Sequence, residues 1–478
     1  MKKLILCLLV PVLLATGCKK WLDVKPKTQV DEGQLLSLEN GFEDALYGVY
    51  ATMAGGSLYG DQLTMSFVDV LAQRYSAQST PEHDFYQAAL YNYQDPGVKA
   101  RITNIWDSAY FAIANVNNIL NHIDGQRSVF QADNYRLVKG EALGLRAFLH
   151  FDLLRLFGPS YLSNPGKLSI PYVKTVSGGV TPLGTVSAVL DSVIADLTLA
   201  DSLLGAYKNI LPPFNNITPL QNDWLNNRQY HFNYWAAEAL LARVYLYKGN
   251  KQQALLHATA VINSGMFTFI TSAAITNLHD RTFTPEQVFS VSKYNLLPQV
   301  SNYFLAAGTA GSNLGTNTHL TNTYGNGGVV DKVFETASGG ATDFRYAFLW
   351  AASNNIYFPA KFWQDAGQFS HLNNLVPLIR LPEMYYIAAE CSDPATATTY
   401  LNKVRENRGL KDLDILPDAA TAQNEIFKEY QKEFYCEGQL FYYYKRVNAT
   451  QILYTNTPGT DKVYVLPLPD GEIQFGNR

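Results

Sequence analysis

Residues 233–265 read NYWAAEALLARVYLYKGNKQQALLHATAVINSG, and this stretch decides the fold. Asn233 is a favourable N-cap for a helix over residues 234–247, and the Lys-Gly-Asn turn that follows ends it. A second helix over residues 251–264 stops at Gly265, a residue type that favours the left-handed conformation after a helix. The stretch therefore predicts two helices joined by a short turn.

The residues of this hairpin follow the pattern of a tetratricopeptide repeat. The pattern consists of a leucine, an alanine and a tyrosine, then a turn glycine, then two alanines four residues apart: Leu241, Ala242, Tyr245, Gly249, Ala254 and Ala258. One such hairpin cannot bury its own apolar face, so other helices must stack against it.

Apolar residues recur at helical spacing in seven further stretches, which predicts that helices supply this packing. These stretches are residues 42–53, 105–123, 141–157, 186–204, 378–391, 398–408 and 419–434. The predicted fold class is therefore all-α, a scaffold of tetratricopeptide-like helical hairpins.

Two long segments interrupt this scaffold. Residues 55–97 are rich in glycine, aspartate, glutamine and tyrosine, and residues 267–377 are rich in glycine, asparagine, threonine and aromatic residues. Neither segment has a sustained period. We expect long irregular loop insertions there, with short helices in the first. Loops of this length in a compact domain usually carry function.

The N-terminus resembles a bacterial lipoprotein signal. Lys2 and Lys3 precede an apolar run, and residues 14–18 read LATGC, so residues 1–17 are predicted to be a signal peptide that is cleaved before Cys18. Cys18 would then carry fatty acyl chains such as palmitate, which anchor a protein stably when two or three are present. Ala15 stands where leucine is preferred. An uncleaved transmembrane helix is the alternative, but the apolar run is shorter than the roughly 18 residues needed to span a bilayer.

Composition and motifs exclude several classes of function. The chain of 478 residues carries a formal net charge of −4 and has no basic run, so we expect no nucleic-acid binding. HExxH, CxxC and GxSxG motifs are absent, and Gly179–Gly184 has P-loop spacing but is followed by Thr185 instead of lysine. We therefore predict neither an enzyme nor a cofactor. Cys391 and Cys436 could form a disulfide or remain free.

Several separated blocks, in this order, carry a resemblance to a known family. They are residues 18–26, residues 106–115 (W-x-x-x-Y-x-x-I-A-N), residues 141–158 with residues 170–173 behind them, residues 240–246, residues 378–390 and residues 401–405. They resemble the SusD/RagB family of outer-membrane nutrient-binding lipoproteins. One departure is that Glu429, Glu433 and Glu437 keep the family's acidic positions while two expected arginines are missing, which suggests a divergent branch.

The resemblance implies a domain organisation. Residues 1–17 would be the signal peptide, residues 18–38 a lipid-anchored tether, and residues 39–478 a single SusD-like domain. Within that domain, residues 39–232 would form the N-terminal part and residues 233–478 the C-terminal part.

The resemblance also implies a function. The protein would sit on the outer membrane facing the cell exterior, capture glycan oligomers and deliver them to a TonB-dependent SusC-like transporter without chemistry of its own. Capture of oligopeptides, as associated with RagB-like relatives, is the alternative. A surface lipoprotein hydrolase and a tetratricopeptide adaptor are weaker alternatives.

Candidate ligand residues follow from the chemistry of sugars. Sugar rings pack their C–H faces on aromatic rings, while their hydroxyl groups need polar partners, and the loops interleave both types of side chain. The candidates are Tyr59, Asp61, Tyr86, Tyr91, Asn92, Tyr93, Tyr303, Tyr324 and Trp350.

The charged residues in the predicted helices have a different explanation. A buried charge normally needs a partner of opposite sign, so we expect ion pairs between packed helices rather than ligand contacts. The residues concerned are Arg146, Arg380, Glu383, Glu390 and Arg405.

Overall fold

The computed structural model describes residues 35–77, 81–210, 223–304, 311–317, 329–353, 356–365 and 372–476. Its longer helices are α3 (Glu39–Met53), α6 (Pro96–Ile123), α7 (Asn134–Phe157), α8 (Val186–Leu204), α9 (Tyr234–Tyr247), α10 (Lys251–Asn263), α15 (Leu381–Glu390), α16 (Pro394–Glu406) and α17 (Ala419–Glu433). The shorter ones are α4 (Phe67–Leu71), α5 (Tyr86–Ala89), α11 (Ser272–Leu278), α12 (Leu297–Phe304), α13 (Val329–Val333), α14 (Phe344–Phe348), α18 (Gln439–Arg446), α19 (Asp461–Tyr464) and α20 (Asp470–Phe475).

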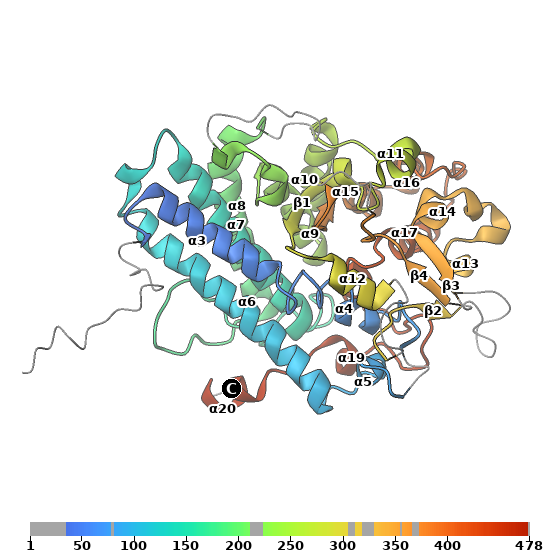
Figure 1. Ribbon diagram of the computed structural model, residues 1–478, viewed down its shortest axis with the longest axis horizontal. Helices are drawn as coiled ribbons and strands as arrows, with labels where there is room; N and C mark the ends of the chain where they lie inside the picture. Colours follow the sequence, from blue (N-terminus) through green and yellow to red (C-terminus); the bar gives the residue numbers. More distant parts are fainter. Residues whose placement is uncertain are drawn as a thin grey trace, which may run out of the picture.

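The long helices pack side by side and form the scaffold. In Figure 1, α3, α6, α7 and α8 lie on one side of the molecule, and the elements from β1 to α17 lie on the other. Helix α7 packs along both α6 and α8, and α10 packs against both α9 and α15. One continuous core runs from Leu36 to Leu466. The predicted all-α fold is confirmed.

The hairpin that decides the fold has the predicted bounds, except that its second helix ends at Asn263, one residue earlier than predicted. The Asn233 side chain accepts a hydrogen bond from the Ala236 amide at 3.0 Å, and the Asn250 side chain accepts one from the Gln253 amide at 3.2 Å. Gly249 and Gly265 both have positive φ, +80° and +67°, so both turns use glycine's conformational freedom.

The other predicted helices all form, but several boundaries differ, because α3, α6, α7 and α16 begin earlier than predicted and α15 begins later. Helix α6 begins at Pro96, earlier than predicted, because the Asp95 side chain caps it and accepts bonds from the Gly97 and Val98 amides. The prediction that a helix starts at Leu378 is wrong. Residues 378–380 belong to strand β5 instead, and α15 begins only after Arg380 because Pro382 stands in its first turn.

Two small antiparallel sheets lie within the helical scaffold. β1 (Gln287–Ser292) pairs with β5 (Leu375–Arg380), and β4 (Ile356–Pro359) lies between β2 (Thr316–Asn317) and β3 (Trp350–Ser353). Residues 55–97 contain the short helices α4 and α5, as expected. The segment 267–377 is more regular than expected, because it holds four helices and most of the strands.

Glu433 lies at the centre of a buried cluster of charges. Its carboxylate is bound by Arg345 at 2.7 Å, by Arg380 at 2.5 Å and by Arg408 at 2.8 Å, and all four side chains are almost fully buried. Arg380 and Arg408 also bind Glu286. Burial alone would raise the pKa of Glu433, but the three guanidinium groups hold that pKa well below its usual range. We call these five residues the Glu433 cluster.

The other charges predicted to be paired are also paired. Arg146 binds Asp196 at 2.6 Å, Glu383 binds Arg243 at 2.6 Å and Glu390 binds Arg446 at 2.6 Å. Arg405 lies 3.4 Å from Glu429. Their explanation as helix-packing charges is therefore confirmed.

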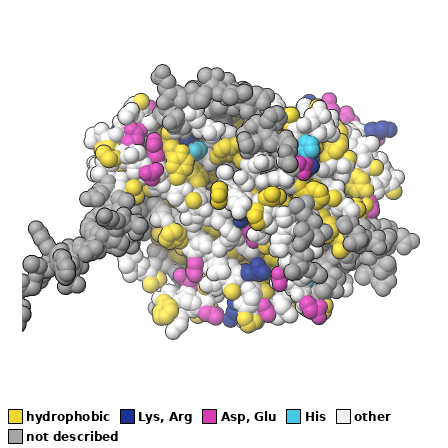
Figure 2. Space-filling model, in the orientation of Figure 1, with side chains coloured by type: hydrophobic (Ala, Val, Ile, Leu, Met, Phe, Trp, Pro, Cys, Tyr) yellow, Lys and Arg dark blue, Asp and Glu magenta, His cyan; other side chains and the backbone are white. Residues whose placement is uncertain are grey.

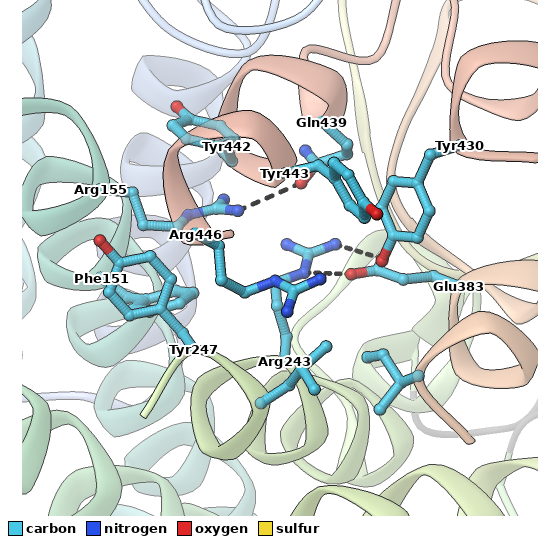
Figure 3. Close-up of a pocket in the computed structure, with 12 residues that line it drawn as sticks. Phe151, Arg155, Arg243, Tyr247, Glu383, Tyr430, Gln439, Tyr442, Tyr443 and Arg446 are labelled. Carbon is cyan, nitrogen blue, oxygen red and sulfur yellow. Dashed lines mark hydrogen bonds and ion pairs between the residues drawn. The ribbon is translucent and has the colours of Figure 1, made fainter. Parts of the chain in front are cut away.

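Three arginines converge on a small internal cavity. Figure 3 shows the Arg155, Arg243 and Arg446 side chains beside one another, with both bonds from Arg243 to Glu383. The cavity has about 30 Å³, which is enough for one or two water molecules. Among the described residues, one nitrogen of Arg243 and the Tyr442 hydroxyl have no hydrogen-bond partner, so bound water would satisfy them. This cavity is too small for a sugar ring and belongs to the core.

Both described cysteines are free thiols. Cys436 is buried, with its sulfur 3.3 Å from the Tyr75 hydroxyl, and Cys391 is half-buried. Cys18 and the tether lie outside the described residues, except for the last four tether positions. Within the described ranges, no helix is both long enough and apolar enough to cross a bilayer.

Glu433→Gln should destabilise the protein strongly. The substitution removes the charge that three buried arginines share, and breaking a buried ion pair costs about 3–5 kcal/mol. The matched control is Glu406→Gln, because Glu406 pairs with Lys403 at 3.2 Å on an exposed surface, where a pair contributes about 1 kcal/mol or less. Denaturant unfolding measures both, and equal losses would show that the Glu433 cluster does not hold the fold.

Candidate ligand-binding site at the start of α12

Five segments of the chain meet around α12. They are the loop after α3 (residues 55–66), residues 81–86, the first turns of α6, the turn 293–296 and α12 itself. Figure 1 shows α12 near the middle of the view, next to α4 and between α6 and the sheet of β2, β4 and β3. In Figure 2, this face carries hydrophobic side chains with only scattered charged groups between them.

Asp61 connects the loop after α3 with α12. Its carboxylate accepts a hydrogen bond from the Tyr303 hydroxyl at 3.1 Å, from the Ser66 hydroxyl at 2.6 Å and from the Gln62 amide at 3.1 Å. Arg101, from α6, donates to the Gln62 oxygen at 3.3 Å. These bonds join one loop and two helices into one polar cluster.

Lys293 completes the charge balance of this cluster. Burial raises the pKa of Asp61, and the bonds from Ser66 and Tyr303 together with the charge of Lys293 offset only part of that rise. Burial lowers the pKa of Lys293, and the negative charge of Asp61 offsets part of that fall. We call Asp61, Gln62, Arg101, Lys293 and Tyr303 the Asp61 cluster.

Tyr294 follows Lys293 of the Asp61 cluster in the sequence and is 93 % exposed. Two hydrogen bonds to Asn374 fix the turn that carries Tyr294. The Asn374 carbonyl accepts one from the Lys293 amide at 2.8 Å, and its side-chain oxygen accepts the other from the Leu296 amide at 3.1 Å. Asn295 and Asn374 both have positive φ, which asparagine tolerates better than most residues. No ring packs against Tyr294 within the described part of the chain, so a fixed backbone presents an open aromatic face to solvent.

Buried aromatic rings lie beneath the cluster. Phe85 packs edge-on against Tyr303 with 6.1 Å between ring centroids, and the Arg101 guanidinium lies 4.2 Å above the Phe85 ring. His83 is bonded to the Asn313 carbonyl at 2.9 Å, which ties residues 81–86 to residues 311–317. The polar groups therefore rest on a fixed apolar base.

Three predicted ligand residues belong to the core. The Tyr59, Tyr91 and Tyr93 rings are at most 9 % exposed. Their hydroxyl groups donate to Asp152 at 2.8 Å, to the Leu71 carbonyl at 2.9 Å and to the Val463 carbonyl at 2.5 Å. The prediction of an exposed platform at residues 91–93 does not fit this burial, because a ring with both faces covered has no surface for a sugar.

The remaining predicted residues are divided. Asp61 and Tyr303 are brought together in the Asp61 cluster. Tyr86 is half-buried on α5, and Asn92 is exposed, with its amide bonded to Gln87. Trp350, on β3, is half-buried and packs edge-on against a tyrosine ring of the core, so it has a packing role. Tyr324 lies outside the described residues.

Sequence reasoning missed Arg101, Lys293 and Tyr294. A usable signal existed at residues 293–295, where a cation, an aromatic ring and an amide follow one another between a strand and a helix. Arg101 had no such signal, because only the packing of α6 against the loop after α3 brings it to the cluster. Within the described residues, no group of three or more His, Cys, Asp or Glu side chains is placed to hold a metal ion.

Tyr91→Ala and Tyr294→Ala should differ in their effect on stability. Loss of a buried aromatic ring costs about 3–5 kcal/mol, whereas a substitution at an exposed position away from special features stays within about 0.5 kcal/mol. Thermal and denaturant unfolding of both variants measure the difference. An unchanged melting temperature for Tyr91→Ala would contradict its burial.

Comparison with known proteins identifies the family. A family model described as starch-binding and associating with the outer membrane matches residues 20–246, and the model of the SusD family matches residues 316–467. Among curated proteins, the chain is 24 % identical to SusD-like protein P2 of Formosa agariphila, with 99 % of this chain and 97 % of the relative covered. It is 21 % identical to SusD-like protein P25 of the same organism, with 82 % of this chain and 79 % of the relative covered.

Solved structures share the fold. A SusD superfamily protein of Bacteroides thetaiotaomicron superposes with a TM-score of 0.66 at 22 % identity, over 92 % of this chain and 98 % of that chain. Surface glycan-binding protein A of Bacteroides uniformis superposes with a TM-score of 0.66 at 17 % identity, over 91 % of this chain and 98 % of that chain. The solved structures show the shared fold, and the two family models, which match residues 20–246 and 316–467, show that the chain belongs to the SusD/RagB family.

Proposed function

We propose that the protein binds glycan oligomers at the Asp61 cluster and Tyr294. The observation that carries the proposal is Tyr294, a 93 % exposed ring fixed beside a cluster of buried and half-buried polar groups. A sugar ring can stack its C–H face on this tyrosine, and solvent alone competes for that surface. One of the two matching family models is described as starch-binding, which supports glycans as the class of ligand.

The neighbouring polar groups suit sugar hydroxyls. Lys293 and Arg101 are half-buried, so each can donate a charge-assisted hydrogen bond outward while its stem stays packed. Asp61 and Tyr303 are almost fully buried and already bonded to each other, so they hold the site in shape. Stacking would fix the plane of a sugar ring, and the two cations would fix its orientation.

We further propose where the protein acts. The signal-like N-terminus supports lipidation at Cys18 and attachment to the outer membrane, facing the cell exterior. The family model's description, associating with the outer membrane, supports the same location. A tethered binding protein would then pass its glycan to a SusC-like TonB-dependent transporter and perform no chemistry of its own.

Tyr294→Ala should weaken glycan binding by at least about tenfold, because exposed aromatic anchors often contribute 2 kcal/mol or more to binding. Lys293→Gln and Arg101→Gln should weaken it less. Calorimetric titration of the full chain with maltoheptaose, other neutral oligosaccharides and short peptides measures the affinities. Chromatography of the same mixtures measures any cleavage.

The matched control is Phe111→Ala, which removes another exposed ring, 62 % accessible, from α6. Equal affinities for the Tyr294→Ala and Phe111→Ala variants would place the ligand elsewhere. Binding of peptides alone would favour the oligopeptide alternative, and release of cleaved products would overturn a function without catalysis.

Cys18→Ser should release the protein from the membrane. The acyl chains contribute about 0.8 kcal/mol per buried methylene, and a serine cannot carry the same thioether-linked lipid. Fractionation of the native host and surface proteolysis of intact cells test the location, and Lys19→Ser serves as the control. Mild-detergent pull-down should recover a large barrel protein, and its absence would count against the transporter as partner.

A further inference from the structure

A second hollow lies apart from the Asp61 cluster. It has about 380 Å³, within the range of small-ligand sites, and opens between residues 334–342, the end of α16 with the residues after it, and α17. It shares no lining residue with the Asp61 cluster. We call it the Glu335 hollow.

Four cations line the Glu335 hollow in a chain whose net charge is negative. They come from α16, the loop after it and α17: Arg405, Lys411, Lys428 and Lys432. Lys411 is exposed and makes no ion pair within the described residues. The lining anions are only two, Glu335 and Glu425.

Glu335 places a carboxylate between two of these lysines. Its oxygens lie 2.9 Å from the Lys428 ammonium and 2.9 Å from that of Lys432. Burial would raise the pKa of Glu335, but Lys432 and Lys428 lower it overall, so the carboxylate stays ionised. The hollow thus already contains a site whose geometry fits a carboxylate.

The residue that fills this site is held in an unfavourable backbone conformation. Glu335 has φ +53°, in the left-handed region, which costs a residue other than glycine roughly 1–2 kcal/mol. Its side chain is 36 % exposed, whereas that of Lys432 is 2 % exposed. Lys432 has one other anionic neighbour, Glu429 at 3.4 Å. An anion that displaced the Glu335 side chain would therefore still neutralise the buried Lys432 ammonium.

We propose that the Glu335 hollow binds an acidic saccharide, whose carboxylate takes the place of the Glu335 carboxylate between Lys428 and Lys432. Lys411 would add a third charge at the mouth. Ser338 is exposed at the rim, and Gly339 leaves open space where a side chain would stand, so the hydroxyl groups of a sugar ring fit beside the anion. The ligand class rests on the proposed glycan function, while the carboxylate requirement rests on the Glu335 site alone.

The test compares trigalacturonate with its fully methyl-esterified form, which keeps the rings and removes the charges. The full chain should bind the acid at least about tenfold more tightly than the ester, because each charge-assisted bond is roughly twice as strong as a neutral one. Lys428→Gln and Lys411→Gln should each weaken binding of the acid by about fivefold or more. Glu335→Gln should tighten it about threefold or more, because the internal competitor loses its charge.

Lys403→Gln is the matched control, because Lys403 lies on the exposed side of α16 and pairs with Glu406 outside the hollow. Equal affinities for the acid and the ester would overturn the proposal. So would a Glu335→Gln variant that binds the acid no better than the unaltered protein, or lysine variants that match Lys403→Gln. Melting curves of each variant, with and without trigalacturonate, separate lost binding from lost folding.

The two proposals fail separately. If binding of neutral oligosaccharides depends on Tyr294 while Lys428→Gln leaves trigalacturonate binding unchanged, only the proposal of an acidic site is wrong. If no neutral oligosaccharide binds while trigalacturonate binding depends on Lys428, only the proposal that the Asp61 cluster binds glycans is wrong.

Discussion

The buried carboxylate of Glu433 is the interaction on which the rest of the structure depends. It brings together α17, the end of β5, the second residue after α16 and helix α14, because arginines from the last three of these bind it. Four charges at this depth are costly unless every one is paired. The ion pairs of Glu433 therefore fix the packing of four distant segments. If one segment moved away, a buried charge would lose its partner in an apolar environment.

The Glu433 cluster also positions the candidate ligand site. Arg380 is the last residue of β5, β5 pairs with β1, and β1 leads directly into the turn that carries Lys293 and Tyr294. Asn374, just before β5, fixes that turn from the other side through two hydrogen bonds. Because a backbone held in this way loses little entropy on binding, the Glu433 cluster supports the geometry of the proposed ligand site.

The two candidate sites differ in chemistry as well as in place. The Asp61 cluster offers one exposed ring and half-buried cations on an aromatic base, which suits a neutral sugar. The Glu335 hollow has no exposed ring in its lining and four cations, with an internal carboxylate as its present occupant. A protein that carries both could hold a chain of mixed sugars at two points and gain affinity from their linkage.

The sequence by itself determined the helical scaffold and the pairing of buried charges. Helix periodicity and caps act over a few residues, so the hairpin around Gly249 could be placed to the residue, and Arg380 could be expected to find a partner. Only the tertiary structure decided which tyrosines face solvent: Tyr91 and Tyr294 both lie in polar, glycine- or asparagine-rich surroundings, yet one is buried and the other is open. Burial depends on which distant segment packs over a ring, and no local pattern records that contact.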